Sequence, residues 1–297
     1  MLHKERRKVI VPFLAPAVIL YLVFFIYPAL RGLYLSLFDW SGFTLPAQYI
    51  GLKNFQQLVH DVGYLTSLKN TLALLFIGGA FVFGLAFLFT YILSSGLRGK
   101  KFFRAVIFLP NVVAPIALTT LWGFIYNPRF GLINSGLRAV GLSQWTRLWT
   151  EPDKLFGAIM VALIWIYTGF YLVLLLAGAD KIPQELYDAA RVDGTSPFQM
   201  FTRLTVPLLW DVIDIGVVLW MITALKQFEF IYAFSGPGYL RPETWTLAIY
   251  LQIMGFGKRD PIFRLGYASA IGATLVGLVI VFAILGGWLM RRETVQY

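Results

Sequence analysis

The chain has 297 residues, of which 58% are hydrophobic and only 13% are charged, and its mean hydropathy is +0.71. A soluble domain of this length does not need so apolar a composition, so these values indicate an integral membrane protein. The formal net charge of +10 is explained by membrane topology and lipid headgroups rather than by nucleic acid, and the absence of cysteine excludes disulfides, thiol catalysis and cysteine metal sites.

Apolar segments of membrane-spanning length recur along the whole chain. A helix of about 20 residues crosses the ~30 Å hydrocarbon core of a bilayer. Because unpaired backbone groups are costly in lipid, each such segment should be a helix, and the expected fold is an all-α membrane protein. Six segments qualify, at approximately residues 9–30, 70–93, 105–126, 155–177, 208–232 and 266–290.

The first of these segments follows a basic N-terminus and could be taken for a signal peptide. It runs past twenty residues and shows no clear small-residue cleavage site, so we interpret it as a retained first helix. Lys and Arg are concentrated in the short segments 1–8, 94–104, 178–207 and 291–297, whereas the alternate segments are longer. This distribution predicts that both termini and residues 182–207 are cytoplasmic.

Nucleotide and metal chemistry lack the necessary residues. The pair Gly99–Lys100 has Ser94 where a phosphate-binding loop requires its first glycine, so the chain is not expected to hydrolyse a nucleotide by itself. His3 and His60 would lie on opposite sides of the membrane, which argues against a histidine metal site or a catalytic triad. We therefore expect no catalytic residues, no metal and no cofactor bound by this chain.

Residues 182–207 form a polar segment between two apolar spans. Pro183 suits the first turn of a helix, and Glu185 and Asp188 place negative charge near its positive end. Gly194 follows about three turns later and can adopt the left-handed conformation that closes a helix. A short helix from about Pro183 is therefore predicted.

A second short helix follows this glycine. Ser196 is a good N-cap, and Pro197 suits the first helical position. The helix is expected to stop by Pro207. The segment as a whole is thus predicted to be a helix-turn-helix.

One face of the first helix should be small and smooth. Leu186, Ala189, Ala190 and Gly194 recur at about helical spacing, flanked by acidic residues. Such a strip fits a groove on a partner protein. The alternative is an amphipathic loop that lies on the lipid headgroups.

The same segment resembles a known signature. Its pattern of Asp188-Ala189-Ala190, three residues, Gly194, nine residues and then Leu204-x-Val206-Pro207 is similar to EAA-x3-G-x9-I-x-L-P of the membrane permeases of binding-protein-dependent ABC importers. Asp188 stands where the signature has glutamate, and Leu204 and Val206 stand where it has Ile and Leu. The surrounding sequence resembles the carbohydrate-uptake branch.

The resemblance extends over nearly the whole chain. Segments 12–40, 50–55, 102–134, 225–238 and 266–270 resemble, in order, pieces of the first permease of the maltose-type family. This resemblance implies a type I ABC importer permease fold, with residues 1–297 as a single transmembrane permease domain and residues 182–207 as its coupling loop. It implies a prokaryotic plasma (inner) membrane location.

The resemblance also implies the partners. These are a second related permease, two ATP-binding subunits that dock at residues 182–207 and carry ATP and Mg²⁺, an extracytoplasmic solute-binding protein, and membrane lipid. The residues implied to couple to the ATPases are Glu185, Asp188, Ala189, Ala190, Asp193 and Gly194. Asp193 could pair with the ATPase, bond within the turn or be a solvated turn residue.

The resemblance implies a substrate path among the fourth to sixth helices. On the fifth helix, Trp220, Thr223, Ala224 and Gln227 share one face, which combines an aromatic plate with two hydrogen-bonding groups. Sugars have apolar CH faces and hydroxyls, which suit such a face. On the fourth helix the implied residues are Ile166, Tyr167 and Phe170. Packing between helices or contact with lipid is the alternative for each.

Ionisable residues in a membrane span suggest a second reading of the fifth helix. Such residues often mark ion pathways, but we expect these to be structural or interfacial, with Lys226 and Glu229 forming an i, i+3 pair. A proton-coupling role would instead fit an ion-gradient-driven secondary transporter or channel, which should show related halves, and no clear repeat is visible. The residues are Asp211, Asp214, Lys226 and Glu229.

Overall fold

The computed structural model describes residues 2–43, 47–236, 241–257 and 263–289. Within these ranges it is almost entirely helical, as predicted, and five helices are long and apolar enough to cross a membrane, or six if one bent pair counts as a span. The basic residues Arg291 and Arg292, on which part of the predicted orientation depends, lie outside the described residues.

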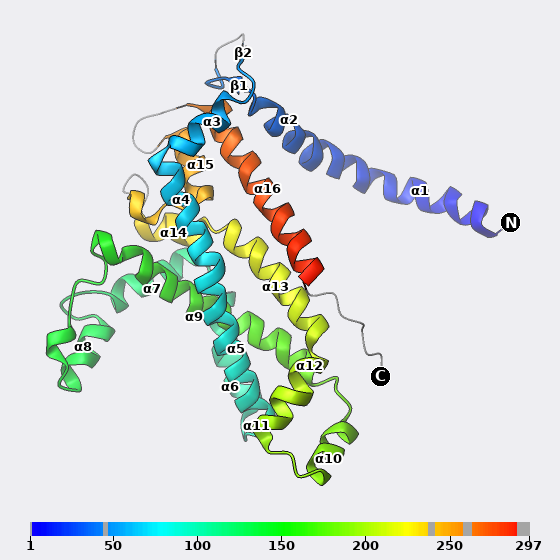
Figure 1. Ribbon diagram of the computed structural model, residues 1–297, viewed down its shortest axis with the longest axis vertical. Helices are drawn as coiled ribbons and strands as arrows, with labels where there is room; N and C mark the ends of the chain where they lie inside the picture. The colour runs from blue at the N-terminus through cyan, green and yellow to red at the C-terminus, as the bar shows by residue number, and fades with distance from the viewer. Residues whose placement is uncertain (1, 44–46, 237–240, 258–262, 290–297) are drawn as a thin grey trace.

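The first span projects away from the other helices (Figure 1). It consists of α1 (Leu2–Tyr21) and α2 (Tyr27–Leu35), joined by a π-helical turn at Leu22–Ile26. Within the apolar stretch Pro12–Leu35, the most apolar window has no residue buried inside the chain. Within the described residues α2 contacts α16, whereas α1 projects from the bundle.

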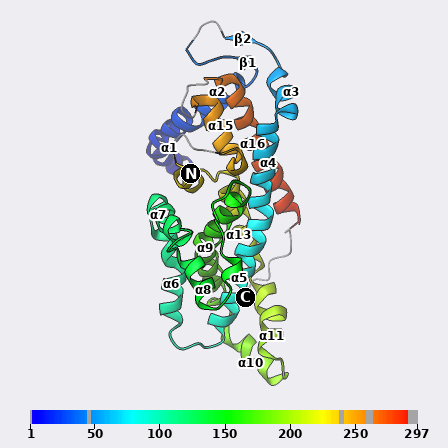
Figure 2. The ribbon, with the colours of Figure 1, turned by 90° about the vertical axis from the view of Figure 1, so that its left-hand side faces the viewer.

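The segment after α2 forms a small cap at one end of the molecule (Figures 1 and 2). Strands β1 (Phe38–Asp39) and β2 (Gln48–Tyr49) pair antiparallel, and α3 (Lys53–His60) follows. The second span then runs back as α4 (Val62–Ala73), a π-helical turn (Leu74–Gly78) and α5 (Gly79–Ser94).

Asp61 joins three helices at this end. Its carboxylate accepts from the backbone N–H groups of Gly63 and Tyr64, which caps α4, and from the hydroxyls of Tyr250 at 2.6 Å and Tyr267. Burial works against ionisation of Asp61, but these hydrogen bonds to its charged form outweigh burial and lower its pKa.

The third span is broken, unlike the single helix predicted over residues 105–126. Helices α6 (Lys100–Val112) and α7 (Pro115–Ile125) meet at an angle of 104°. The cause is local: proline disfavours helical backbone at the residue before it, and Ala114 has φ −57° and ψ 136°. Short helix α8 (Leu132–Ala139) and a 3₁₀ turn (Ser143–Trp145) follow.

Helix α9 (Pro152–Ala179) is the central helix of the bundle, with α5 and α6 packed along it. Its buried side chains, together with those of α5, α7 and α13, form the main hydrophobic core. At Gly169 the backbone of α6 lies directly against it. Glycine is required there because a side chain has no space.

The rest of the chain contains the polar segment and the last spans. The polar segment comprises α10 (Gln184–Val192), α11 (Pro197–Met200), a π-helical turn (Phe201–Thr205) and α12 (Val206–Leu208). It lies at the end of the molecule opposite β1 and β2 (Figures 1 and 2). The remaining elements are α13 (Trp210–Leu225), α14 (Glu229–Ser235), a 3₁₀ turn (Pro242–Thr244), α15 (Leu247–Phe256) and α16 (Leu265–Leu289).

Candidate functional site

Helix α10 has the boundaries that its local chemistry predicts. It starts directly after Pro183 and ends at Val192, and Gly194 has a φ of +76°. Residues with a side chain rarely adopt this left-handed conformation, so glycine allows the chain to turn sharply between the two helices.

The second helix begins with a capping box. The Ser196 hydroxyl accepts from the backbone N–H of Gln199, and the Gln199 side chain accepts from the backbone N–H of Ser196. The helical backbone ends at Leu208, one residue beyond Pro207, and a single turn residue, Leu209, separates it from α13.

An exposed stripe on α10 contains most of the predicted coupling residues. Glu185, Asp188, Ala189 and Asp193 are exposed, and their spacing places them on one face of the helix. Val192 belongs to the same face and is 88% exposed. Val192 is not among the residues predicted from the sequence, although its position three residues after Ala189 indicates this face.

The opposite face of α10 packs against the bundle. Leu186 and Tyr187 contact the main core, so the expected outward strip that included Leu186 was wrong. Its side chain is drawn inward because burial of apolar surface is favourable. Ala190 is half-buried, and its carbonyl accepts from the Thr195 N–H at 3.1 Å. The hydroxyls of Tyr187 and Thr205 lie 3.2 Å apart and join α10 to the π-helical turn that follows α11.

Asp188 has a partner on its own helix. One carboxylate oxygen is 2.6 Å from the guanidinium of Arg191 and accepts a hydrogen bond of 3.2 Å from Gln184. Both charged side chains are exposed, and such pairs contribute little to stability. The pair can therefore be exchanged for a charged group on another protein at small cost.

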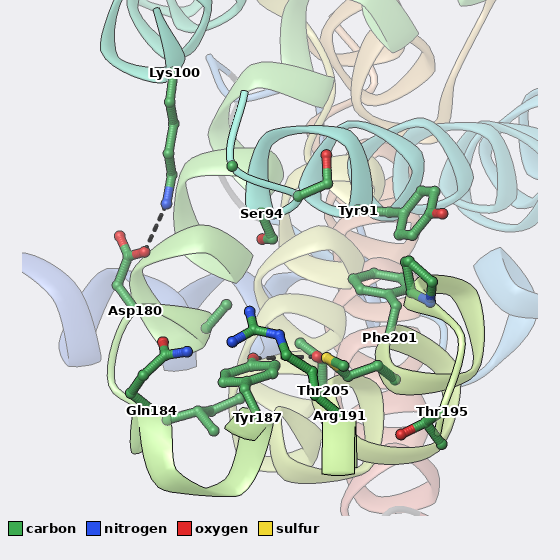
Figure 3. Close-up of a pocket in the computed structure, with 16 residues that line it drawn as sticks. Tyr91, Ser94, Lys100, Asp180, Gln184, Tyr187, Arg191, Thr195, Phe201 and Thr205 are labelled. Atoms are coloured by element: carbon green, nitrogen blue, oxygen red, sulfur yellow. Dashed lines mark hydrogen bonds and ion pairs between the residues drawn. The ribbon is translucent and has the colours of Figure 1, made fainter. Parts of the chain in front are cut away.

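A cavity of about 590 Å³ lies behind α10 and α11 (Figure 3). Tyr187, Arg191 and Thr205 line it from the polar segment, and the ends of α5 and α9 line it from the bundle. At its edge Lys100 of α6 forms an ion pair of 2.8 Å with Asp180, which follows α9.

A second cavity, of about 420 Å³, lies among α6, α7, α9, α13 and α14. We call it the central cavity. Four of the predicted path residues line it, namely Ile166, Tyr167, Thr223 and Gln227. Three further polar residues of the lining were not predicted as path residues: Asn111 near the end of α6, Lys226 and Glu229.

Tyr167 and Gln227 meet at the wall of this cavity. The Tyr167 hydroxyl donates to the side-chain carbonyl of Gln227 at 2.9 Å. A hydroxyl, amides and ring faces that border one space provide the mixed polar and apolar surface that sugars require.

The other three predicted path residues lie outside the lining of the central cavity. Trp220 is 3% exposed, and its indole N–H donates to the carbonyl of Leu75 at 2.8 Å. Ala224 is buried, and the ring of Phe170 packs edge-on against Tyr171.

The expected Lys226–Glu229 pair is not formed. Among the described residues, the oxygens of Glu229 have no Lys or Arg nitrogen within 4 Å. The helix breaks between the two residues, so they do not have the i, i+3 geometry that the prediction assumed. Near the other end of α13, Asp211 is exposed and Asp214 is half-buried. Nowhere in the described ranges do His, Asp and Glu gather in a group that could hold a metal ion.

The sequence of this chain matches one family model and several known proteins. The family model described as "Binding-protein-dependent transport system inner membrane component" matches residues 80–295. The probable ABC transporter permease protein YurN of Bacillus subtilis is 36% identical over 277 residues, covering 92% of this chain and 91% of that protein. The trehalose/maltose transport system permease protein MalF of Thermococcus litoralis is 33% identical over 269 residues, covering 91% and 89%.

A solved structure has the same fold. A chain in the crystal structure of a bacterial ABC transporter involved in the import of the acidic polysaccharide alginate superposes with a TM-score of 0.83 at 24% identity, covering 98% of each chain. The signature in residues 182–207 and the apolar helices agree with these matches. The chain therefore belongs to the family of inner membrane components of binding-protein-dependent transport systems, as a multi-pass permease.

Proposed function

We propose that this chain is one of two related permease subunits of an importer that moves a sugar or sugar-like solute into the cell. An external binding protein delivers the solute, and two separate ATP-binding subunits hydrolyse ATP. Family membership supports the importer, and the names of relatives that transport trehalose, maltose and lactose support a sugar. ATP and Mg²⁺ would bind to the ATP-binding subunits.

The observation that carries the proposal is the exposed stripe of α10. Glu185, Asp188, Ala189, Val192 and Asp193 present two small or apolar side chains between three carboxylates. This surface fits a groove with a basic rim on an ATP-binding subunit. Because the opposite face of α10 is packed against the core, a movement of the docked subunit would carry the helix with it and tilt the attached spans.

The central cavity supplies the path for the solute in this proposal. Tyr167 and Gln227 offer hydrogen bonds, and Ile166 offers an apolar contact. Weak contacts of both kinds allow a sugar to be held briefly and then released. The cavity lies at the break between α6 and α7 and beside the break between α13 and α14, which is where non-helical backbone is tolerated in a membrane protein.

Reconstitution in proteoliposomes tests this function. The chain is purified with its partner permease and ATP-binding subunits, and the binding protein is added outside with radiolabelled disaccharides, oligosaccharides or glycerol 3-phosphate in turn. We expect uptake of a sugar that requires ATP inside the vesicles and is unaffected by ionophores. Uptake that ionophores abolish and ATP does not stimulate would instead establish a gradient-driven transporter.

A further inference from the structure

The break between α13 and α14 exposes a backbone carbonyl that must find a partner. Gln227 lies in this break and is 6% exposed, so its carbonyl has little access to water. A buried carbonyl without a hydrogen bond is strongly unfavourable. The Thr246 hydroxyl, 19 residues further along the chain, donates to this carbonyl at 2.9 Å in a buried contact.

Thr246 is itself held in place by its surroundings. Its side chain is 0% exposed and accepts from the backbone N–H of Ile249, which caps α15. The next residue, Leu247, donates its backbone N–H to the hydroxyl of Thr71 on α4 at 3.0 Å. Thr246 thus has a fixed position relative to α4.

The residues just before Thr246 are attached to the same helix. The side-chain amide of Asn70 on α4 donates to the carbonyls of Glu243 and Trp245, both at 2.9 Å. Segment 243–247 is therefore joined to α4 by three side-chain hydrogen bonds. It forms a rigid support behind the α13–α14 break.

The support is linked to the central cavity through Gln227. Thr246 holds the backbone of Gln227, and the side chain of Gln227 accepts from Tyr167 on the cavity wall. We propose that Thr246 is a positioning residue of the transport path, which fixes the Gln227 side chain by fixing the backbone of the α13–α14 break. This inference rests on the proposed function of the central cavity.

Three substitutions separate positioning from general stability. Thr246→Val removes the hydroxyl at nearly constant volume, and Thr246→Ser retains it. Thr244→Val is the matched control, because Thr244 is also 0% exposed in the same segment but its hydroxyl donates only to the carbonyl of Arg241. We expect Thr246→Val, but neither other variant, to change the region around Gln227.

Hydrogen–deuterium exchange of the purified importer is the first measurement. We expect amide exchange in residues 226–231 to rise by about tenfold in Thr246→Val, as follows from the loss of a buried hydrogen bond. Thr244→Val and Thr246→Ser should match the parent protein. Equal exchange in Thr246→Val and Thr244→Val would overturn the inference. This measurement needs no substrate, so it decides the inference even if no sugar is transported.

Uptake kinetics provide the second measurement, with the sugar identified in proteoliposomes. We expect Thr246→Val to raise KM by about fivefold with little change in the maximal rate per assembled complex. Tyr167→Phe should have a similar effect without touching α15. In the double variant, the free-energy change calculated from KM should be smaller than the sum of the two single changes, because both substitutions act on Gln227. Additive effects, or a loss of maximal rate at constant KM, would contradict positioning.

Discussion

The backbone carbonyl of Ile107 on α6 lies against Gly169 on α9, so closely that a Cβ added at Gly169 would stand 2.2 Å from its oxygen. This contact joins α6, which borders the central cavity, to the helix that leads into the coupling segment. Small residues allow such close helix packing in membranes.

This contact predicts a sharp difference between two glycines of α9. Gly169→Ala should lower the melting temperature in detergent and the yield of folded protein, because the added Cβ must push α6 away. Gly157→Ala is the control, since no atom of another element in the described residues lies within 4 Å of the position of its Cβ. It should be neutral or slightly stabilising, because alanine favours helix more than glycine by about 1 kcal/mol. Equal melting temperatures for both variants would show that α6 and α9 are not in close contact.

ATP-driven uptake is predicted to require a negative charge at Asp188. Asp188→Lys should reduce ATP-driven uptake by about tenfold or more, because like charges repel across a charged contact. Asp188→Glu, which restores the residue of the family signature, should keep uptake near the parent rate. Co-purification of the ATP-binding subunits measures docking directly. Undiminished docking and uptake in Asp188→Lys would exclude this residue from the interface.

Gly194 is predicted to be needed for the turn between the coupling helices. At φ +76° an alanine is strained by about 1–2 kcal/mol, and proline cannot adopt this angle. Gly194→Pro should abolish uptake and Gly194→Ala should reduce it, while the amount of protein in the membrane stays constant. The control is Gly136→Ala, where there is open space around the Cβ position and φ is not positive. Normal uptake by Gly194→Pro would show that transport does not depend on this turn.

Asp61 predicts a pH dependence of stability. Its pKa in the folded protein is lowered, so its hydrogen bonds stabilise the fold at neutral pH. This contribution should be fully present above the ordinary carboxyl pKa of about 3.9 and should be lost as the pH falls towards the lower folded value. The melting temperature of Asp61→Asn should be a few degrees below that of the parent at pH 7. The difference between the two melting temperatures should begin to shrink only below about pH 4. A constant difference across this range would contradict the assignment.

Local chemistry in the sequence predicted the coupling helices well. Gly194, Ser196 and Pro197 act through contacts within a few residues of themselves, and the structure places a turn, a cap and a helix start there. Pro115 is a local signal of the same kind for the break after Ala114. Residues 105–126 were nevertheless predicted as one helix, because the run is almost uninterruptedly apolar.

Contacts between segments that are distant in the sequence could not be predicted from such local patterns. The orientation of Leu186 depends on the bundle that α10 packs against, and the bond from Thr246 to Gln227 depends on how α15 lies beside the α13–α14 break. Trp220 shares the predicted helix face with Gln227, yet it is enclosed by the π-helical turn after α4 and by the rings of Tyr167 and Tyr171 on α9. Helical periodicity defines a face, whereas the neighbours of that face are determined by tertiary packing.

The projecting first helix has a consequence for biogenesis. Because the stretch Pro12–Leu35 buries so little against its own chain, most of its flank remains in contact with lipid until another subunit arrives. Apart from the packing of α2 against α16, the described residues give this stretch little support, so a lone copy should be recognised by membrane quality-control proteases as an orphan. Cellular lifetime of this subunit should therefore rise with co-expression of its companion permease, and the stoichiometry of the two would be set by degradation rather than by synthesis.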